Sequence, residues 1–129
     1  MVDANVGGTL ETMKPNPVWD ANSWSDTVAA FSDDTLIIRV WGGDWCDDCR
    51  RQLPDFAAAI NAADIPNKRV HEYSVEKNAD GEKYGPSVKE YGINRIPTVV
   101  IEREDEEVAR FVETESVPIA VFLAEQLTE

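Results

Sequence analysis

Two cysteines, Cys46 and Cys49, stand where a strongly apolar stretch gives way to a helical pattern, and they are the only cysteines of the chain. Residues 36–41 form an almost unbroken apolar run, which predicts a buried strand that ends at Gly42-Gly43. Residues 47–63 carry apolar side chains at spacings of three and four, which predicts a helix. We therefore expect a strand, a turn with Cys-x-x-Cys and a helix, around which the rest of the chain folds.

This position gives the two sulfur atoms different chemistry. Cys46 falls at the first turn of the predicted helix, where unpaired backbone N–H groups and the helix dipole favour an anion such as a thiolate. Cys49 lies one turn further along, on the neighbouring face, and we expect it to be less exposed. One sulfur that attacks and a second that resolves is the arrangement of a thiol-disulfide redox site.

A Cys-x-x-Cys pair also occurs in structural zinc sites, and two cysteines can simply pack in a core. A closed zinc site needs four ligands, and beyond the cysteines the chain offers one histidine, His71, and carboxylates. We therefore expect redox chemistry, no metal, and no cofactor besides the Cys46–Cys49 disulfide. His71 lies in a predicted strand without other site residues, and we expect it to be a structural or surface residue.

The chain resembles the thioredoxin family in three separate places. Trp45 precedes Cys46 as in the family's Trp-Cys-x-x-Cys motif, and Pro54 stands where the family has a helix-kinking proline. Ile96-Pro97-Thr98 is similar to the family's cis-proline motif. The resemblance covers residues 23 to 129 and implies a thioredoxin fold of the α/β class, with a central mixed sheet of four to five strands and helices on both faces.

The resemblance also implies roles for individual residues. Cys46 is expected to be the nucleophile and Cys49 the resolving cysteine. The expected substrate-binding residues are Trp45, Ile96, Pro97 and Thr98, with Pro97 cis and its loop facing the Cys46 sulfur.

Several positions depart from the family pattern. The residues between the cysteines are Asp47-Asp48 instead of Gly-Pro, which is similar to a branch that reduces small or restricted disulfides. The family's buried aspartate, lysine and groove glycine correspond here to Val40, Glu72 and Glu113, and the segment before Pro97 is longer by about six residues. With Val40 apolar, Asp48 is a candidate proton acceptor for Cys49; the alternative is a carboxylate favoured only by the helix start.

These features predict a dithiol reductase with a disulfide-containing protein or small molecule as substrate and a reductase as electron donor. The alternatives are a disulfide oxidant or isomerase, and a binding module whose cysteines are not catalytic. The helix start favours the Cys46 thiolate, whereas Asp44, Asp47 and Asp48 oppose it. We therefore expect a reduction potential nearer to the thioredoxin value of about −270 mV than to the oxidant value of about −120 mV.

The remaining pattern fits a single domain of 129 residues with an N-terminal segment at 1–22 and a thioredoxin-like domain at 23–129. Val6–Met13 is a candidate edge strand. Ser23 is expected to cap a first helix with Trp24, Val28 and Phe31 in the core. Later elements are expected as a strand at 69–75, a helix at 86–92, a hairpin at 98–112 and a last helix that starts near Ser116.

The net charge of −13 excludes a nucleic-acid groove and argues against binding to anionic membranes. No apolar run approaches the roughly 18 residues that span a bilayer, and residues 1–10 lack a secretion signal, so we expect a cytoplasmic monomer without membrane contact. The acidity indicates either a merely soluble surface or adaptation to high intracellular salt, as in halophiles.

Overall fold

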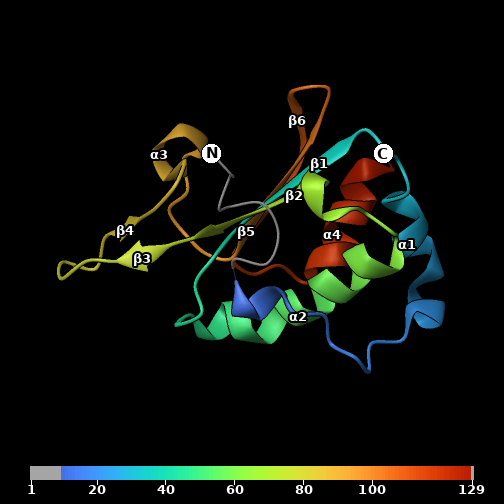
Figure 1. The fold of residues 1–129 in the computed structure, drawn as a ribbon, viewed down its shortest axis with the longest axis horizontal. Helices are drawn as coiled ribbons and strands as arrows, with labels where there is room; N and C mark the ends of the chain where they lie inside the picture. Colours follow the sequence, from blue (N-terminus) through green and yellow to red (C-terminus); the bar gives the residue numbers. More distant parts are fainter. Residues whose placement is uncertain (1–9, 129) are drawn as a thin grey trace.

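The computed structural model describes residues 10–128, which form a four-stranded mixed sheet with helices on both faces (Figure 1). The strand order is β2-β1-β5-β6, with β1 parallel to β2, β5 antiparallel to β1, and β6 antiparallel to β5. The sheet strands are β1 (Leu36–Gly42), β2 (Val70–Ser74), β5 (Thr98–Arg103) and β6 (Glu106–Val112). The predicted fold class is confirmed, with four strands in this sheet.

Three helices contact one another on one face of the sheet: α1 (Ser25–Ala30), α2 (Asp47–Ala62) and α4 (Ile119–Leu127). The short α3 (Val88–Tyr91) lies on the opposite face, where Tyr91 packs 4.9 Å from Trp41 of β1 between ring centroids. Gly92 ends α3 with φ of 65°, as its position in the sequence predicts. The strand β1 therefore lies between the three helices on one face and α3 on the other.

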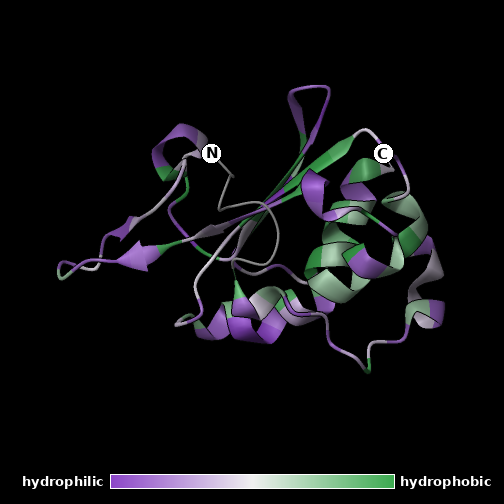
Figure 2. Cartoon of the chain, viewed as in Figure 1, coloured by the Kyte–Doolittle hydropathy of each residue, from purple (hydrophilic) through white to green (hydrophobic). Residues whose placement is uncertain are grey.

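The central strand β1 is buried because it has a partner strand on each side and helices above and below. Leu36, Ile38 and Val40 are all fully buried, and Ile38 pairs with β2 on one side and with β5 on the other. Figure 2 shows β1 as a largely apolar strand inside the fold. Because β1 has a partner strand on each side, the sheet fixes the position of its carboxyl end. The turn with Cys46 follows directly after this end.

The candidate edge strand is wrong for the part of it that the structure describes. Residues 10–13 form no strand: Glu11–Met13 is a 3-10 helix, η1, that contacts α2. Leu10 and Met13 are buried, because residues three apart lie on the same side of a 3-10 helix. The Leu10 N–H donates to the Glu72 carboxylate of β2 at 2.8 Å, so a side chain takes the place of strand pairing. Residues 6–9 lie outside the described part.

The predicted core position of Trp24 is also wrong. Trp24 ends the 3-10 helix η2 (Ala21–Trp24) and is 38 % exposed, whereas Phe31 is buried as expected. The helix start lies earlier than Ser23, because the Asp20 side chain accepts the Asn22 N–H. The extra turn rotates Trp24 out of the core stripe.

The long polar connection after β2 contains a small hairpin that the sequence patterns do not predict. Its strands are β3 (Glu76–Lys77) and β4 (Lys83–Tyr84). The Asn78 side chain holds its turn by accepting the N–H groups of Asp80 and Glu82, each at 2.9 Å. The third 3-10 helix, η3 (Asn67–Arg69), leads into β2. The strands of the hairpin are too short and too charged to give an alternating pattern.

Candidate functional site

Cys46 is the N-cap residue of α2, directly after the turn that follows β1. Its N–H donates to the Gly43 carbonyl at 3.0 Å, and its Sγ accepts the Cys49 N–H at 3.2 Å. A helix start needs such an acceptor because its first N–H groups have no partner within the helix. The Cys46 sulfur thus occupies the place of a capping oxygen, where the helix dipole favours negative charge. The predicted position at the first turn is confirmed.

Cys49 lies one turn into α2 and is more deeply placed than Cys46. The exposed fraction is 0 % for Cys49 and 8 % for Cys46, which confirms the predicted difference in access. Burial is the largest cause that raises the pKa of the Cys49 thiol, followed by its hydrogen bond with Cys46 and, more weakly, by the charge of Asp48. Cys49 therefore stays protonated under conditions in which an exposed thiol would ionise, and Cys46 is the sulfur that a substrate can reach.

The loop before β5 lies against the sulfur atoms. The Ile96–Pro97 peptide bond is cis, as predicted, and the Ile96 carbonyl oxygen lies 3.9 Å from the Cys46 Sγ. Ile96, Pro97 and Thr98 are all buried, and the Thr98 hydroxyl donates to the Arg95 carbonyl at 2.6 Å. The structure therefore brings the predicted loop and Cys46 together.

Trp45 forms an exposed wall next to Cys46. Its indole N–H donates to the Val75 carbonyl at 2.8 Å, which ties the turn after β1 to the end of β2. The Lys77 ammonium nitrogen lies 5.0 Å from the centre of the Trp45 ring, within the range of a cation–π contact. The hairpin that carries Lys77 thus borders the redox site. Sequence reasoning missed this contact because residues 32 positions apart give no local signal.

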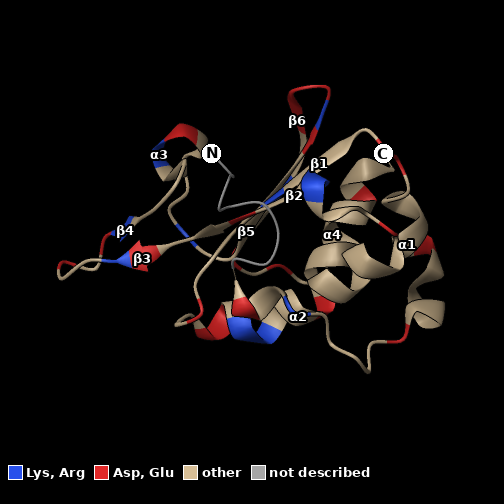
Figure 3. Cartoon of the chain, viewed as in Figure 1, with Lys and Arg blue, Asp and Glu red and all other residues tan. Residues whose placement is uncertain are grey.

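The aspartates around the cysteines have basic partners that sequence reasoning missed. Arg50 bonds to the Asp47 carboxylate and, at 2.7 Å, to the backbone carbonyl of Asp44. Arg51 donates to Asp48 at 2.5 Å. Figure 3 shows these acidic and basic residues next to each other at the start of α2. Both pairs are three residues apart, and residues at this spacing are neighbours on a helix surface, so the sequence could have predicted these contacts. The acidic field at Cys46 is therefore partly compensated.

A second set of contacts joins the cis-proline loop to α2 through Glu113. The Glu113 N–H donates to the Pro97 carbonyl at 2.7 Å, and the Gln52 side chain donates to the Glu113 carbonyl at 2.8 Å. Glu113 has φ of 57°, a left-handed conformation that glycine adopts without steric cost. The assignment of Glu113 to the family's glycine position agrees with this geometry. Sequence reasoning did not identify this contact of Gln52.

Other positions in the described residues bear on the expected chemistry. Within residues 10–128, no group of three or more His, Cys, Asp or Glu side chains could hold a metal ion. Over the same range, no helix is long and apolar enough to cross a membrane.

Val40 is buried and apolar, and it pairs with the buried Glu72 of β2.

Comparisons with known proteins agree with this geometry. The Thioredoxin family model matches residues 16–125, whereas curated protein sequences give no match. Among solved structures, the thioredoxin of Fasciola hepatica is 22 % identical with a TM-score of 0.51, over 84 % of this chain and 91 % of that chain. The mitochondrial thioredoxin 3 of Saccharomyces cerevisiae, in its oxidized form, is 14 % identical with a TM-score of 0.52, over 86 % and 91 %.

A mutant thioredoxin from Halobacterium salinarum NRC-1 is 21 % identical with a TM-score of 0.50, over 93 % of both chains. At these identities, the solved structures show a shared fold. The family model adds the sequence pattern itself, since it spans most of the chain, including Cys46, Cys49 and the cis-proline loop. The chain therefore belongs to the thioredoxin family.

Proposed function

We propose that the protein is a dithiol reductase of disulfide substrates. The observation that carries the proposal is the unequal access of the two sulfur atoms beside the cis-proline loop, with Cys46 at the helix start and Cys49 behind it. Members of the thioredoxin family are disulfide oxidoreductases, so the chain is a redox protein at the least. The reductive direction, the substrate and the donor are parts of the proposal.

The reaction begins when the Cys46 thiolate attacks one sulfur of the substrate disulfide. A bond forms between Cys46 and that sulfur, and the other substrate sulfur leaves as a thiolate that takes up a proton. Cys49 then loses its proton and attacks Cys46, which releases the second substrate thiol. The substrate gains two electrons and two protons, and the chain is left with a Cys46–Cys49 disulfide. A reductase that supplies two electrons restores the dithiol.

The groove around Cys46 has the means to hold an extended substrate. The backbone at Ile96 is a candidate for pairing with a substrate strand, whereas Thr98 lies in β5 between β1 and β6. Trp45 offers an exposed ring beside the sulfur. The proposed location is the cytoplasm, where a reducing pool keeps such a pair as dithiol. We further propose that the protein acts as a monomer, because only one chain is needed to complete this groove.

The decisive experiment measures reduction of insulin and of a small aromatic disulfide by the wild type, Cys46→Ser and Cys49→Ser. We expect Cys46→Ser to be inactive because the nucleophile is absent. We expect Cys49→Ser to accumulate a mixed disulfide, and since the chain has no third cysteine, the adduct must be on Cys46. Activity retained by Cys46→Ser would contradict the proposal. A measured potential near the oxidant value of about −120 mV would favour the oxidant alternative.

A further inference from the structure

The hairpin of β3 and β4 carries two lysines next to the redox site. Lys77 and Lys83 are directly opposite each other in the antiparallel pair, so their side chains lie on the same face of the hairpin. The Lys77 ammonium nitrogen lies over the Trp45 ring, 5.0 Å from its centre, and Trp45 directly precedes Cys46. The face of the hairpin that carries both lysines is therefore turned towards the redox site.

This arrangement of two lysines is unfavourable for the hairpin by itself. Like charges directly opposite each other in antiparallel strands destabilise the pairing. Among the residues that the structure describes, neither Lys77 nor Lys83 forms an ion pair, whereas most arginines do. Acidic side chains are not scarce, because the chain has 25 Asp and Glu against 12 Lys and Arg. An anion bound beside the two ammonium groups would relieve their repulsion.

The acidic residues of the hairpin do not neutralise this face. Glu76 pairs with Tyr84, one residue along each strand, and successive side chains of a strand point to opposite faces. Asp80 and Glu82 lie in the turn, where the Asn78 side chain accepts their N–H groups. Figure 3 shows a basic residue on each strand of the hairpin. The face turned towards Trp45 therefore carries positive charge from both strands.

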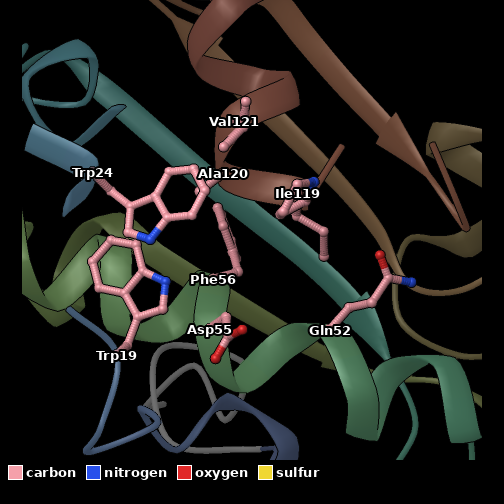
Figure 4. Close-up of a pocket in the computed structure, with 9 residues that line it drawn as sticks. Trp19, Trp24, Gln52, Asp55, Phe56, Ile119, Ala120 and Val121 are labelled. Carbon is pink, nitrogen blue, oxygen red and sulfur yellow. The ribbon is translucent and has the colours of Figure 1, made fainter. Parts of the chain in front are cut away.

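The lysine contact is particular to the tryptophan at the redox site. Trp24, the other exposed tryptophan of the described part, stacks on Trp19 with 6.4 Å between ring centroids, in a hollow lined by aromatic side chains (Figure 4). The Trp45 ring has a cation over it instead. The hairpin also lies in the segment that is longer than in the family pattern, so the resemblance does not supply this contact.

We propose that Lys77 and Lys83 bind a carboxylate that lies beside the disulfide of the substrate. This inference rests on the proposed reductase function and narrows the substrate class to disulfides with an acidic group near a sulfur. A carboxylate fits better than a phosphate, because the net charge of −13 repels an anion more strongly the more charge that anion carries. The carboxylate belongs either to an Asp or Glu side chain of a polypeptide or to a small disulfide acid.

The test uses peptides with one disulfide ring that carry either Glu or Gln next to a cysteine, on one side of the ring or on the other. The reduced protein is mixed with each peptide at about 0.15 M salt, where the Debye length is about 8 Å. The reduced peptide is quantified after acid quenching, which gives the second-order rate constant. Opposite charges about 4 Å apart in water attract enough for about a fivefold effect. We therefore expect the wild type to reduce a Glu peptide about fivefold faster than its Gln counterpart at one position at least.

A pair of small disulfides, dithiodipropionic acid and its diamide, distinguishes the two sources of the carboxylate. A preference for acid over amide in the peptides alone assigns the carboxylate to a polypeptide. A preference in the small pair alone assigns it to a small disulfide acid. No preference in either set would overturn this inference.

The variants test which charges produce the preference. Lys77→Gln and Lys83→Gln should each lower the ratio of acid to amide rate constants, and Lys77→Glu should bring it below one, because the new charge repels the acid. The matched control is Lys68→Gln, which removes the same charge from an exposed residue of η3. Lys68 lies before β2, whereas the redox site follows β1 at the other end of this parallel pair. The control should keep the wild-type ratio.

Several outcomes separate this inference from the proposed function. A ratio that the Lys77 variants do not change would overturn this inference alone. Equal slowing of all substrates in Lys77→Gln would do the same, because Lys77 would then act on the site and not on the substrate charge. At about 1 M KCl the wild-type ratio should fall towards one, and an unchanged ratio would contradict an electrostatic origin. Failure of the wild type to reduce any substrate would overturn the proposed function as well.

Discussion

The burial of Cys49 couples the stability of the reduced protein to pH. Folding raises the pKa of this thiol above its ordinary value of 9.0, chiefly through burial. Below the ordinary pKa, both the folded and the unfolded chain keep the proton, so the stabilising effect is complete. Above it, only the unfolded chain releases the proton, and the free energy of unfolding falls by up to about 1.4 kcal/mol per pH unit.

We therefore predict that the reduced wild type loses stability between about pH 8.5 and pH 10, and that Cys49→Ala loses clearly less over the same range. Denaturant unfolding at a series of pH values, in the presence of a phosphine reductant, measures both slopes. The variant is the control for all other ionisable groups, because these are the same in both proteins. Parallel slopes would show that Cys49 is not the group responsible.

For Asp48, a role as the proton acceptor for Cys49 can be tested separately from the effect of its charge. It precedes Cys49, and 34 % of its side chain is exposed while it pairs with Arg51. If it accepts the Cys49 proton, Asp48→Asn should slow resolution of the mixed disulfide about tenfold or more, since general bases contribute about 10²–10⁴-fold. Attack by Cys46 should change little. Stopped-flow measurement of both steps gives the answer.

Asp47→Asn is the matched control, because Asp47 also pairs with an arginine three residues on but has 86 % of its side chain exposed. It should leave resolution near the wild-type rate. Equal slowing of attack and resolution in Asp48→Asn would show that Asp48 acts only through its charge and does not accept the Cys49 proton.

At the scale of elements, a polar cluster links β1, β2, β5 and α3 on the face of the sheet that α3 covers. Arg39 of β1 bonds to Glu102 of β5 at 2.8 Å and to the Tyr73 hydroxyl of β2 at 2.6 Å. Tyr91 of α3 donates to the other Glu102 oxygen at 2.7 Å. Burial, and secondly this bond, raise the pKa of Tyr91 to about 12. The carboxylate of Glu102 in β5 thus connects β1 with α3.

We predict that Glu102→Gln lowers the free energy of unfolding by about 1–3 kcal/mol, because it weakens charge-assisted bonds to two partners. The pKa of Tyr91 should also move down towards the ordinary tyrosine value of 10.0. Denaturant unfolding and absorbance titration of the tyrosines measure the two effects.

The control is Lys14→Met, which breaks an ion pair with Glu11 whose side chains are both largely exposed. It should lower the free energy of unfolding clearly less than Glu102→Gln does, because exposed ion pairs contribute little to stability. A loss in Glu102→Gln no larger than that in Lys14→Met would mean that the cluster does not hold the elements together.

At the scale of the whole molecule, the excess of acidic residues predicts that salt stabilises the fold. The chain has 25 Asp and Glu against 12 Lys and Arg, and Figure 3 shows acidic residues in helices, strands and turns across the fold. Self-repulsion of like charges weakens as the Debye length falls to about 3 Å at 1 M salt. We predict that the Tm rises between 0.05 M and 1 M KCl.

Thermal unfolding followed by circular dichroism measures this effect. The double variant Asp80→Lys and Glu104→Lys, in two exposed turns, should show a smaller rise because it carries less negative charge. A Tm that does not rise with KCl would remove the interpretation of the acidity as adaptation to high salt.

The sequence alone determined those parts of the structure that depend on short stretches of chain. The apolar run of β1 and the three-and-four spacing of α2 fix where the strand ends and the helix begins, so Cys46 had to lie at a helix start. Gly92 ends α3 because a left-handed residue closes the last turn. The cis-proline loop was predicted from a motif, which is again a local pattern.

Only the tertiary structure decided which distant side chains meet. The outward position of Trp24 and its stacking on Trp19 depend on where the chain turns before α1. The contact between Lys77 and Trp45, and the path from Gln52 through Glu113 to Pro97, join residues that are far apart in sequence. Local propensity and periodicity record the conformation of a few neighbouring residues, whereas such contacts form only when the sheet and helices have packed, because packing alone sets the distance between separate elements.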